Sequence, residues 1–127
     1  TGQTRVAIIG AGPAGFYAVP DGDTRLKIRI DRPTTGAYVG NTYVHDGAEY
    51  GMRTRYGRAG ADGVYHGDII EVIRVIAADP QAAAQAYGRL VGVCGICGRH
   101  LEDETSVAYG IGPICRGKAE TGYGWVW

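Results

Sequence analysis

Three cysteines near the C-terminus constrain the fold of this chain more than any other feature. Cys94 and Cys97 are separated by two residues, and Cys115 follows a Gly-Ile-Gly-Pro-Ile segment, residues 110–114. Two thiolates at this spacing can bind one tetrahedral ion when the turn between them directs its backbone N–H groups at the sulfurs. A third thiolate at the start of a helix, where the helix dipole stabilises negative charge, is typical of treble-clef and zinc-ribbon-like sites. The sequence therefore predicts a structural Zn²⁺ site at these three cysteines.

The sequence alone does not identify the fourth ligand of such an ion. His100 is the nearest candidate in sequence, although Cys-x2-Cys-x2-His places three donors very close together for one ion. The alternatives are His45, His66, Asp103 and a water molecule. Glu102 and Glu104 lie in an acidic run that suits the first turn of a short helix over 105–109, so we expect a structural ion rather than a hydrolytic one. Three reduced cysteines without a metal are the competing interpretation, and it does not account for their paired spacing.

The string CGICGRHLEDETSVAYGIGPICRGK, residues 94–118, resembles a zinc-finger-like domain of unknown function found in actinobacterial and actinophage proteins. That family carries Cys-x2-Cys-Gly-Arg, then Leu-x-Asp/Glu-x-x-Ser, then Gly-Ile-Gly-Pro-x-Cys. A looser likeness extends upstream to Ile30. The resemblance implies zinc and a phage or actinobacterial origin, and it implies no activity. It also counts against His100 as a ligand, because family members often carry a residue there that cannot bind metal.

The remainder of the chain predicts an α+β fold, in which a small antiparallel sheet precedes two helices and the cysteine module. Strict alternation over Arg25–Ile30 is the clearest strand pattern. We expect further strands over Phe16–Val19 and in a hairpin of Asn41–His45 with Glu49–Tyr56 across a two-residue Asp46-Gly47 turn. The segment Gly57–Gly67 reads as a glycine-rich loop.

The hydrophobic period changes from two to that of a helix after Asp68, which is the expected N-cap. A second helix is predicted over Pro80–Tyr87, with Gly88 ending it. These boundaries divide the chain into an α+β body over residues 1–90, a zinc module over 91–120 and an aromatic tail over 121–127. The tail is expected to be either docked on the body or frayed.

Composition limits the functions that this chain can have. Thirteen basic and thirteen acidic side chains cancel, so binding to nucleic acid would need a local basic surface. Arg25, Lys27, Arg29, Arg53 and Arg55 lie among tyrosines in the predicted strands and are the candidates for a single-strand-binding surface. An odd cysteine count with a Cys-x2-Cys pair favours a reducing compartment, here the cytoplasm of a bacterial host. No apolar run approaches the ~20 residues that span a membrane.

No Ser-His-Asp, Cys-His or paired-carboxylate pattern indicates catalysis, so the chain is expected to be a non-enzymatic binding protein whose partner is a protein or a nucleic acid. One minor alternative is flavin or nucleotide binding. The sequence Gly10-Ala11-Gly12-Pro13-Ala14-Gly15 resembles the glycine loop of a flavin-binding reductase. That motif must open a helix of several turns, and Pro20 with the Asp21-Gly22-Asp23 turn leaves too little room for one.

Overall fold

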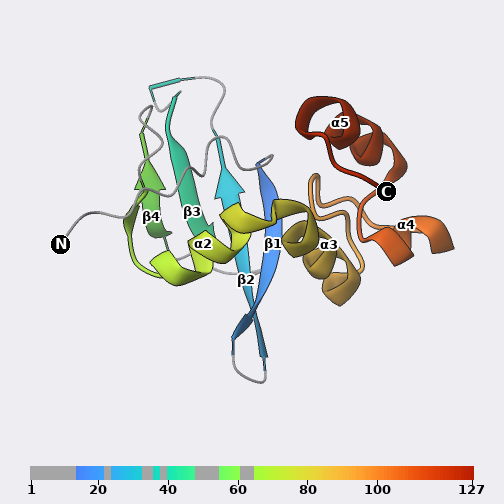
Figure 1. Ribbon diagram of the computed structural model, residues 1–127, viewed down its shortest axis with the longest axis horizontal. Helices are drawn as coiled ribbons and strands as arrows, with labels where there is room; N and C mark the ends of the chain where they lie inside the picture. Colours follow the sequence, from blue (N-terminus) through green and yellow to red (C-terminus); the bar gives the residue numbers. More distant parts are fainter. Residues whose placement is uncertain (1–13, 22–23, 33–35, 38–39, 48–54, 61–64) are drawn as a thin grey trace.

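The structure is a computed structural model that describes residues 14–21, 24–32, 36–37, 40–47, 55–60 and 65–127 (Figure 1). An antiparallel sheet comes first, in the order β1-β2-β3-β4-β5. Its strands are β1 Gly15–Asp21, β2 Thr24–Asp31, β3 Thr42–Asp46, β4 Arg55–Ala59 and β5 Tyr65–Gly67. The helices that follow are α2 Ile70–Ala78, α3 Pro80–Val91, α4 Glu104–Tyr109 and α5 Pro113–Tyr123. This order confirms the predicted α+β class. Within the described ranges, no helix is long and apolar enough to cross a membrane.

The two faces of the sheet differ in chemistry, because apolar and basic side chains alternate along β2 as predicted. Ile28 pairs with Tyr17 and Arg29 with Phe16 across β1 and β2, so apolar and basic side chains of β2 lie on opposite faces. Ile28 is fully buried in one cluster that also contains Ile73 and Ile76 of α2. Figure 1 shows α2 crossing the strands and α3 running beside β1. The helices therefore cover the apolar face, as alternation predicts.

The β3–β4 hairpin differs from the sequence prediction. His45 pairs with Arg55, so the connection cannot be the two-residue Asp46-Gly47 turn, which would place residue 48 opposite His45. The Gly47 N–H instead donates to the Lys27 carbonyl at 3.0 Å and extends the pairing with β2. The expected strand over Glu49–Tyr56 is described only from Arg55, since residues 48–54 lie outside the described ranges.

Part of the predicted loop Gly57–Gly67 is also sheet. Gly57 pairs with Gly67, and Ala59 pairs with Tyr65. The Tyr65 ring is buried, and its hydroxyl donates to the Asp68 carbonyl at 2.6 Å. Burial of this ring against the core stabilises a short edge strand that glycine content alone does not predict.

The predicted start of the second helix at Pro80 is confirmed, whereas the predicted N-cap of the first helix and the predicted end of the second are wrong. Asp68 does not cap α2, because Ile69 precedes the helix in a left-handed conformation with φ 54° and no side chain caps it. Helix α3 does not end at Gly88 but continues to Val91, and Gly92 ends it at φ 85°. Gly88 is buried against the backbone of Gly110, where a Cβ atom would overlap the Gly110 carbonyl. The glycine at position 88 serves close packing between segments rather than helix termination.

The C-terminal segments pack onto the sheet in one continuous core. The Phe16 N–H of β1 donates to the Gly95 carbonyl at 2.7 Å, and the Gly95 N–H donates to the Gly110 carbonyl at 3.0 Å. Cys94, Leu101 and Trp125 belong to the same buried cluster as the strands. The aromatic tail is docked, since Trp125 is buried and the Trp127 indole N–H donates to the Arg116 carbonyl at 3.0 Å.

The glycine motif of the minor nucleotide-binding alternative lies largely outside the described ranges, which begin at Ala14. Its last glycine, Gly15, begins strand β1. A dinucleotide fingerprint needs a helix N-terminus at this point to hold a pyrophosphate. A strand follows the motif instead, so the described backbone lacks that feature.

Candidate metal centre

A tight hairpin turn presents the first two thiols. The Cys94 N–H donates to the Arg99 carbonyl at 2.7 Å, the Gly98 N–H donates to the Cys94 carbonyl at 2.8 Å, and Val93 pairs with His100. Gly98 adopts φ 79°, a left-handed conformation that closes the turn without a Cβ penalty. The Ile96 N–H points at the Cys94 sulfur, 3.4 Å away. These features are those of a zinc knuckle.

The third thiol comes from the start of α5. Gly112 is the N-cap of this helix, Pro113 is at its first position, and Cys115 is in its first turn. Between the knuckle and α5, Asp103 caps the short helix α4 by accepting a hydrogen bond from the Ser106 N–H at 2.9 Å. The acidic run therefore has the capping role that the sequence predicted, and α4 returns the chain so that α5 begins beside the knuckle.

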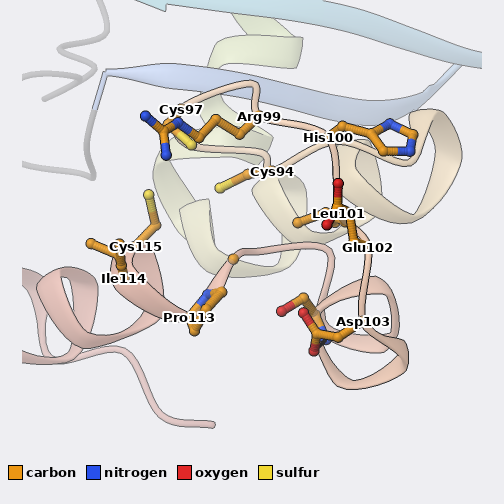
Figure 2. Close-up of a pocket in the computed structure, with 12 residues that line it drawn as sticks. Cys94, Cys97, Arg99, His100, Leu101, Glu102, Asp103, Pro113, Ile114 and Cys115 are labelled. Carbon is orange, nitrogen blue, oxygen red and sulfur yellow. Dashed lines mark hydrogen bonds between the residues drawn. The ribbon is translucent and has the colours of Figure 1, made fainter.

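The three sulfurs of Cys94, Cys97 and Cys115 lie within 4.8 Å of one another (Figure 2). A tetrahedral Zn²⁺ with Zn–S bonds of about 2.3 Å places its sulfurs about 3.8 Å apart, so small side-chain adjustments bring all three into coordination distance. Cys94 and Cys115 are buried, whereas Cys97 is exposed. The donor set fits Zn²⁺, because thiolates select zinc over the hard cations that prefer oxygen.

The local environment shifts the pKa values of the two buried thiols in opposite directions. Burial raises the pKa of Cys94, but hydrogen bonds from the backbone N–H groups of Cys97, Gly112 and Ile96 outweigh it, so the net pKa is lowered. Burial and the neighbouring Cys94 charge raise the pKa of Cys115 to about 12. A divalent cation at this point would reverse the second effect, because it favours deprotonation of every thiol that binds it. The Cys94 thiol therefore loses its proton more readily than the Cys115 thiol when no metal is bound.

The N–H donors at Ile96 and Gly112 are functional groups that sequence analysis did not identify individually. The Gly-Pro pair before Ile114 was the available signal, since proline at the first helical position and a small N-cap residue place free N–H groups at the helix start. Arg99 was missed as well. Figure 2 shows its guanidinium on the same side of the pocket as the thiols.

The proposed fourth ligands do not join the thiols. The cluster found among the described residues contains no histidine nitrogen or carboxylate oxygen. His100 lines the same pocket, but its ring is turned away from the sulfurs (Figure 2). His45 and His66 lie in β3 and β5 of the sheet. Asp103 also lines the pocket, where its carboxylate caps α4.

The described basic candidates lie on strands of the sheet and are not among the residues that line the thiol pocket. Arg29 lies over the Phe16 ring at 5.5 Å and Arg55 over the Tyr43 ring at 4.7 Å. Residue 29 pairs with His45, which in turn pairs with Arg55, so these residues form one row across β2, β3 and β4. Lys27 is half-buried on the same strand. The Arg25 backbone pairs with Pro20 in β1, while its side chain and the whole of Arg53 lie outside the described parts of the structure.

His45 lies within this basic row, and burial together with the Arg55 charge lowers its pKa. The imidazole is therefore biased toward the neutral form at physiological pH. The neutral imidazole adds no further positive charge to the row, and the Asp31 carboxylate of β2 partly opposes the lowering of the His45 pKa.

Comparison with known proteins gives one match. Residues 84–120 match the model of a family of unknown function, DUF6011. No curated protein matches the chain, and no solved structure does. The matched segment runs from α3 into α5 and contains all three cysteines, so the similarity covers the metal centre and not the sheet. It agrees with the expected resemblance to a family of unknown function and assigns no activity.

Proposed function

We propose that this chain is a small, non-enzymatic binding protein that one Zn²⁺ ion stabilises and that a protein partner recognises. The convergence of three thiols within 4.8 Å carries the zinc part of the proposal. Cys94, Cys97 and Cys115 would hold the ion, which would supply a cross-link between the knuckle and α5. The structural role is supported by the burial of two of the three donors inside the core cluster.

Helix α5 shows why such a cross-link is needed. Its only buried residues are Cys115 and Ala119. Two small side chains bury too little apolar surface to hold an eleven-residue helix in place. A metal bond through Cys115 fixes its first turn, and the docked tail fixes its end.

Exposed apolar side chains of the same region support a protein partner. Ile114 is 67% exposed beside the ligand Cys115, and Val126 is 79% exposed. Ile114 borders the thiol pocket and also a second hollow along α5. Together with the adjoining Pro113, which lines the same two hollows, it offers apolar contact area to a protein partner. We place this interaction in the cytoplasm of an actinobacterial cell or a phage-infected host, where thiols stay reduced.

Elemental analysis of reduced protein, purified without added metal, tests the zinc part. We expect one zinc per chain, and we expect Cys94→Ser and Cys115→Ser to lose it. Ile114→Ser is the matched control, because it should keep zinc while weakening capture of a protein partner from host lysate. A metal-free wild-type protein that is fully folded would contradict the zinc part, and unchanged capture by Ile114→Ser would contradict the partner surface.

Single-stranded nucleic acid is the second candidate partner, and the basic row on the sheet supports it. Arg29 and Arg55 are held over aromatic rings, which orders their guanidinium groups. Arg58 is exposed on β4, the strand of Arg55, and pairs with His66 of β5. Phosphates along a single strand would find several cations at strand spacing. Arg29, Arg55 and Arg58 are not among the residues that line the thiol pocket, although the Phe16 ring under Arg29 packs against Gly98 of the knuckle.

Fluorescence anisotropy with labelled single-stranded DNA and RNA, at two salt concentrations, tests this candidate. The expected affinity falls steeply with salt, with a slope of about −0.7 per phosphate contact. Combined replacement of Arg29, Arg55 and Arg58 by alanine should weaken binding and flatten the slope. Ile114→Ser should leave it unchanged. An affinity that the triple replacement does not change would contradict single-stranded nucleic acid as the partner.

A further inference from the structure

The chain has few ways to complete a tetrahedral zinc site with its own side chains. All three cysteines and all three histidines of the sequence fall within the described ranges. His45 and His66 are built into the sheet, and the ring of His100 points away from the sulfurs (Figure 2). Among the described side chains, three sulfurs therefore converge without a fourth donor.

The three thiols line a pocket, and Cys94 and Cys115 also belong to the core cluster. This cavity has a volume of about 240 Å³. Cys94 and Cys115 are at its inner wall, and the exposed Cys97 is at its mouth. Since a water molecule occupies about 30 Å³ of liquid, the cavity has room for a side chain. Its rim combines the apolar Pro113 and Ile114 with polar groups on the opposite side.

The charges around this pocket favour a particular kind of donor. Three thiolates and one Zn²⁺ carry a net charge of −1, and the Arg99 guanidinium lies on the thiol side of the pocket to offset it (Figure 2). Glu102 and Asp103 are on the other side, beyond Leu101. A soft, thiolate-rich site prefers a further sulfur donor to a carboxylate or water oxygen. A nearby guanidinium makes an anionic donor less costly to add.

We propose that the fourth coordination position of the zinc ion faces this pocket and binds a thiolate from outside the chain. The inference rests on the proposed zinc site. The donor is a cysteine side chain of a partner protein or a small-molecule thiol, and both present the same chemistry. On binding, the S–H bond of the thiol breaks and its proton goes to solvent, a metal–sulfur bond would replace the bond to a water molecule, which leaves, and no electrons are transferred. Ile114 at the rim would contact the residues that flank a partner's cysteine.

Cobalt substitution of the full chain tests this proposal, because thiolate-to-cobalt charge transfer in the near ultraviolet reports the number of sulfur ligands. The protein is reduced with a phosphine, loaded with Co²⁺ and titrated with a peptide that contains one cysteine. The same peptide with serine is the control. A fourth thiolate added to three should raise the charge-transfer intensity by about a third, saturably and only with the cysteine peptide.

Parallel samples separate the alternatives. His100→Ala should leave the starting spectrum unchanged, and a changed spectrum would make His100 the fourth ligand and overturn the proposal. A cobalt complex that no thiol alters, or that responds to imidazole alone, would also overturn it. Failure to bind cobalt at all would instead contradict the zinc site itself. Reduced glutathione identifies the source, since binding as tight as that of the peptide supports a small thiol and weaker binding supports a partner's cysteine.

Discussion

Gln81 in α3 and Val126 in the C-terminal tail are 45 positions apart and exchange two hydrogen bonds. The Gln81 side-chain N–H donates to the Val126 carbonyl at 2.6 Å, and the Val126 N–H donates to the Gln81 side-chain oxygen at 3.2 Å. This pair holds the tail so that Trp125 is only 5% exposed and the ring of Trp127 lies edge-on to that of Tyr109 at 5.6 Å. Gln81 thus holds the aromatic end of the chain together with the Trp127–Arg116 hydrogen bond and the buried Trp125 ring.

Replacing Gln81 with methionine should release the tail, because methionine keeps the volume and loses both hydrogen bonds. We expect a loss of about 1–2 kcal/mol in the free energy of unfolding, from two partly exposed hydrogen bonds. Urea unfolding followed by tryptophan fluorescence measures it. Gln85→Met, one turn further along α3, is the control and should leave the tryptophan emission unchanged. A blue-shifted, native-like emission in Gln81→Met would show that the aromatic rings hold the tail without the pair.

Replacing Gly88 with alanine should destabilise the protein, because a Cβ atom at this position overlaps the Gly110 carbonyl. Overpacking of this kind costs about 1–3 kcal/mol. Thermal unfolding compares the variant with Gly117→Ala in α5, where an added Cβ meets nothing within 4 Å. Removing a helical glycine there should stabilise by up to about 1 kcal/mol. Equal effects of the two substitutions would contradict the close approach of α3 to Gly110.

Removing zinc with a chelator should lower the unfolding temperature and loosen α5. Free zinc at about 100 times its dissociation constant stabilises a folded protein by about 2.7 kcal/mol. Differential scanning calorimetry with and without chelator measures the shift, and Cys94→Ser should show none. The stabilisation should decrease as the pH falls, because protons compete with the metal for the thiols. A Cys94→Ser protein that still responds to the chelator would place the metal elsewhere.

The free energy of unfolding should also decrease at alkaline pH, because the buried Tyr65 hydroxyl ionises. Burial, together with the Asp68 charge, raises the pKa of Tyr65 from 10.0 to about 12. The folded pKa exceeds the unfolded one, so its contribution is complete below pH 10 and is lost as the pH rises toward 12. Burial raises the pKa of Tyr17 too, which acts in the same direction. Urea midpoints between pH 7 and 12 measure the trend.

Tyr65→Phe tests whether the alkaline loss of stability comes from Tyr65. The variant should show a smaller decrease above pH 10, the ordinary value for this group. At neutral pH it should be less stable by about 1 kcal/mol, because the hydroxyl bond to the Asp68 carbonyl is lost. Tyr123→Phe, at a ring that is 45% exposed, should leave the stability at neutral pH unchanged and alter the alkaline decrease less than Tyr65→Phe does. An unchanged alkaline slope in Tyr65→Phe would assign the titration to other tyrosines.

Local patterns determined much of this protein. The alternation of Leu26, Ile28 and Ile30 defines β2 and its apolar face, because side chains on a strand point in alternate directions whatever the partner strand. The Cys-x2-Cys spacing defines the knuckle, and Gly112-Pro113 defines the start of α5. Each of these features depends only on residues a few positions apart, so the local sequence is sufficient to predict it.

Only the tertiary structure decided the features that depend on distant segments. Gly88 stays inside α3 because Gly110 packs against it, and Tyr65 extends the sheet because the core buries its ring. The docking of Trp125 follows from how the tail meets α3 and α5. Such contacts join residues that no local pattern relates, and their free energy exceeds the weak preferences of individual residues for turn, cap or loop.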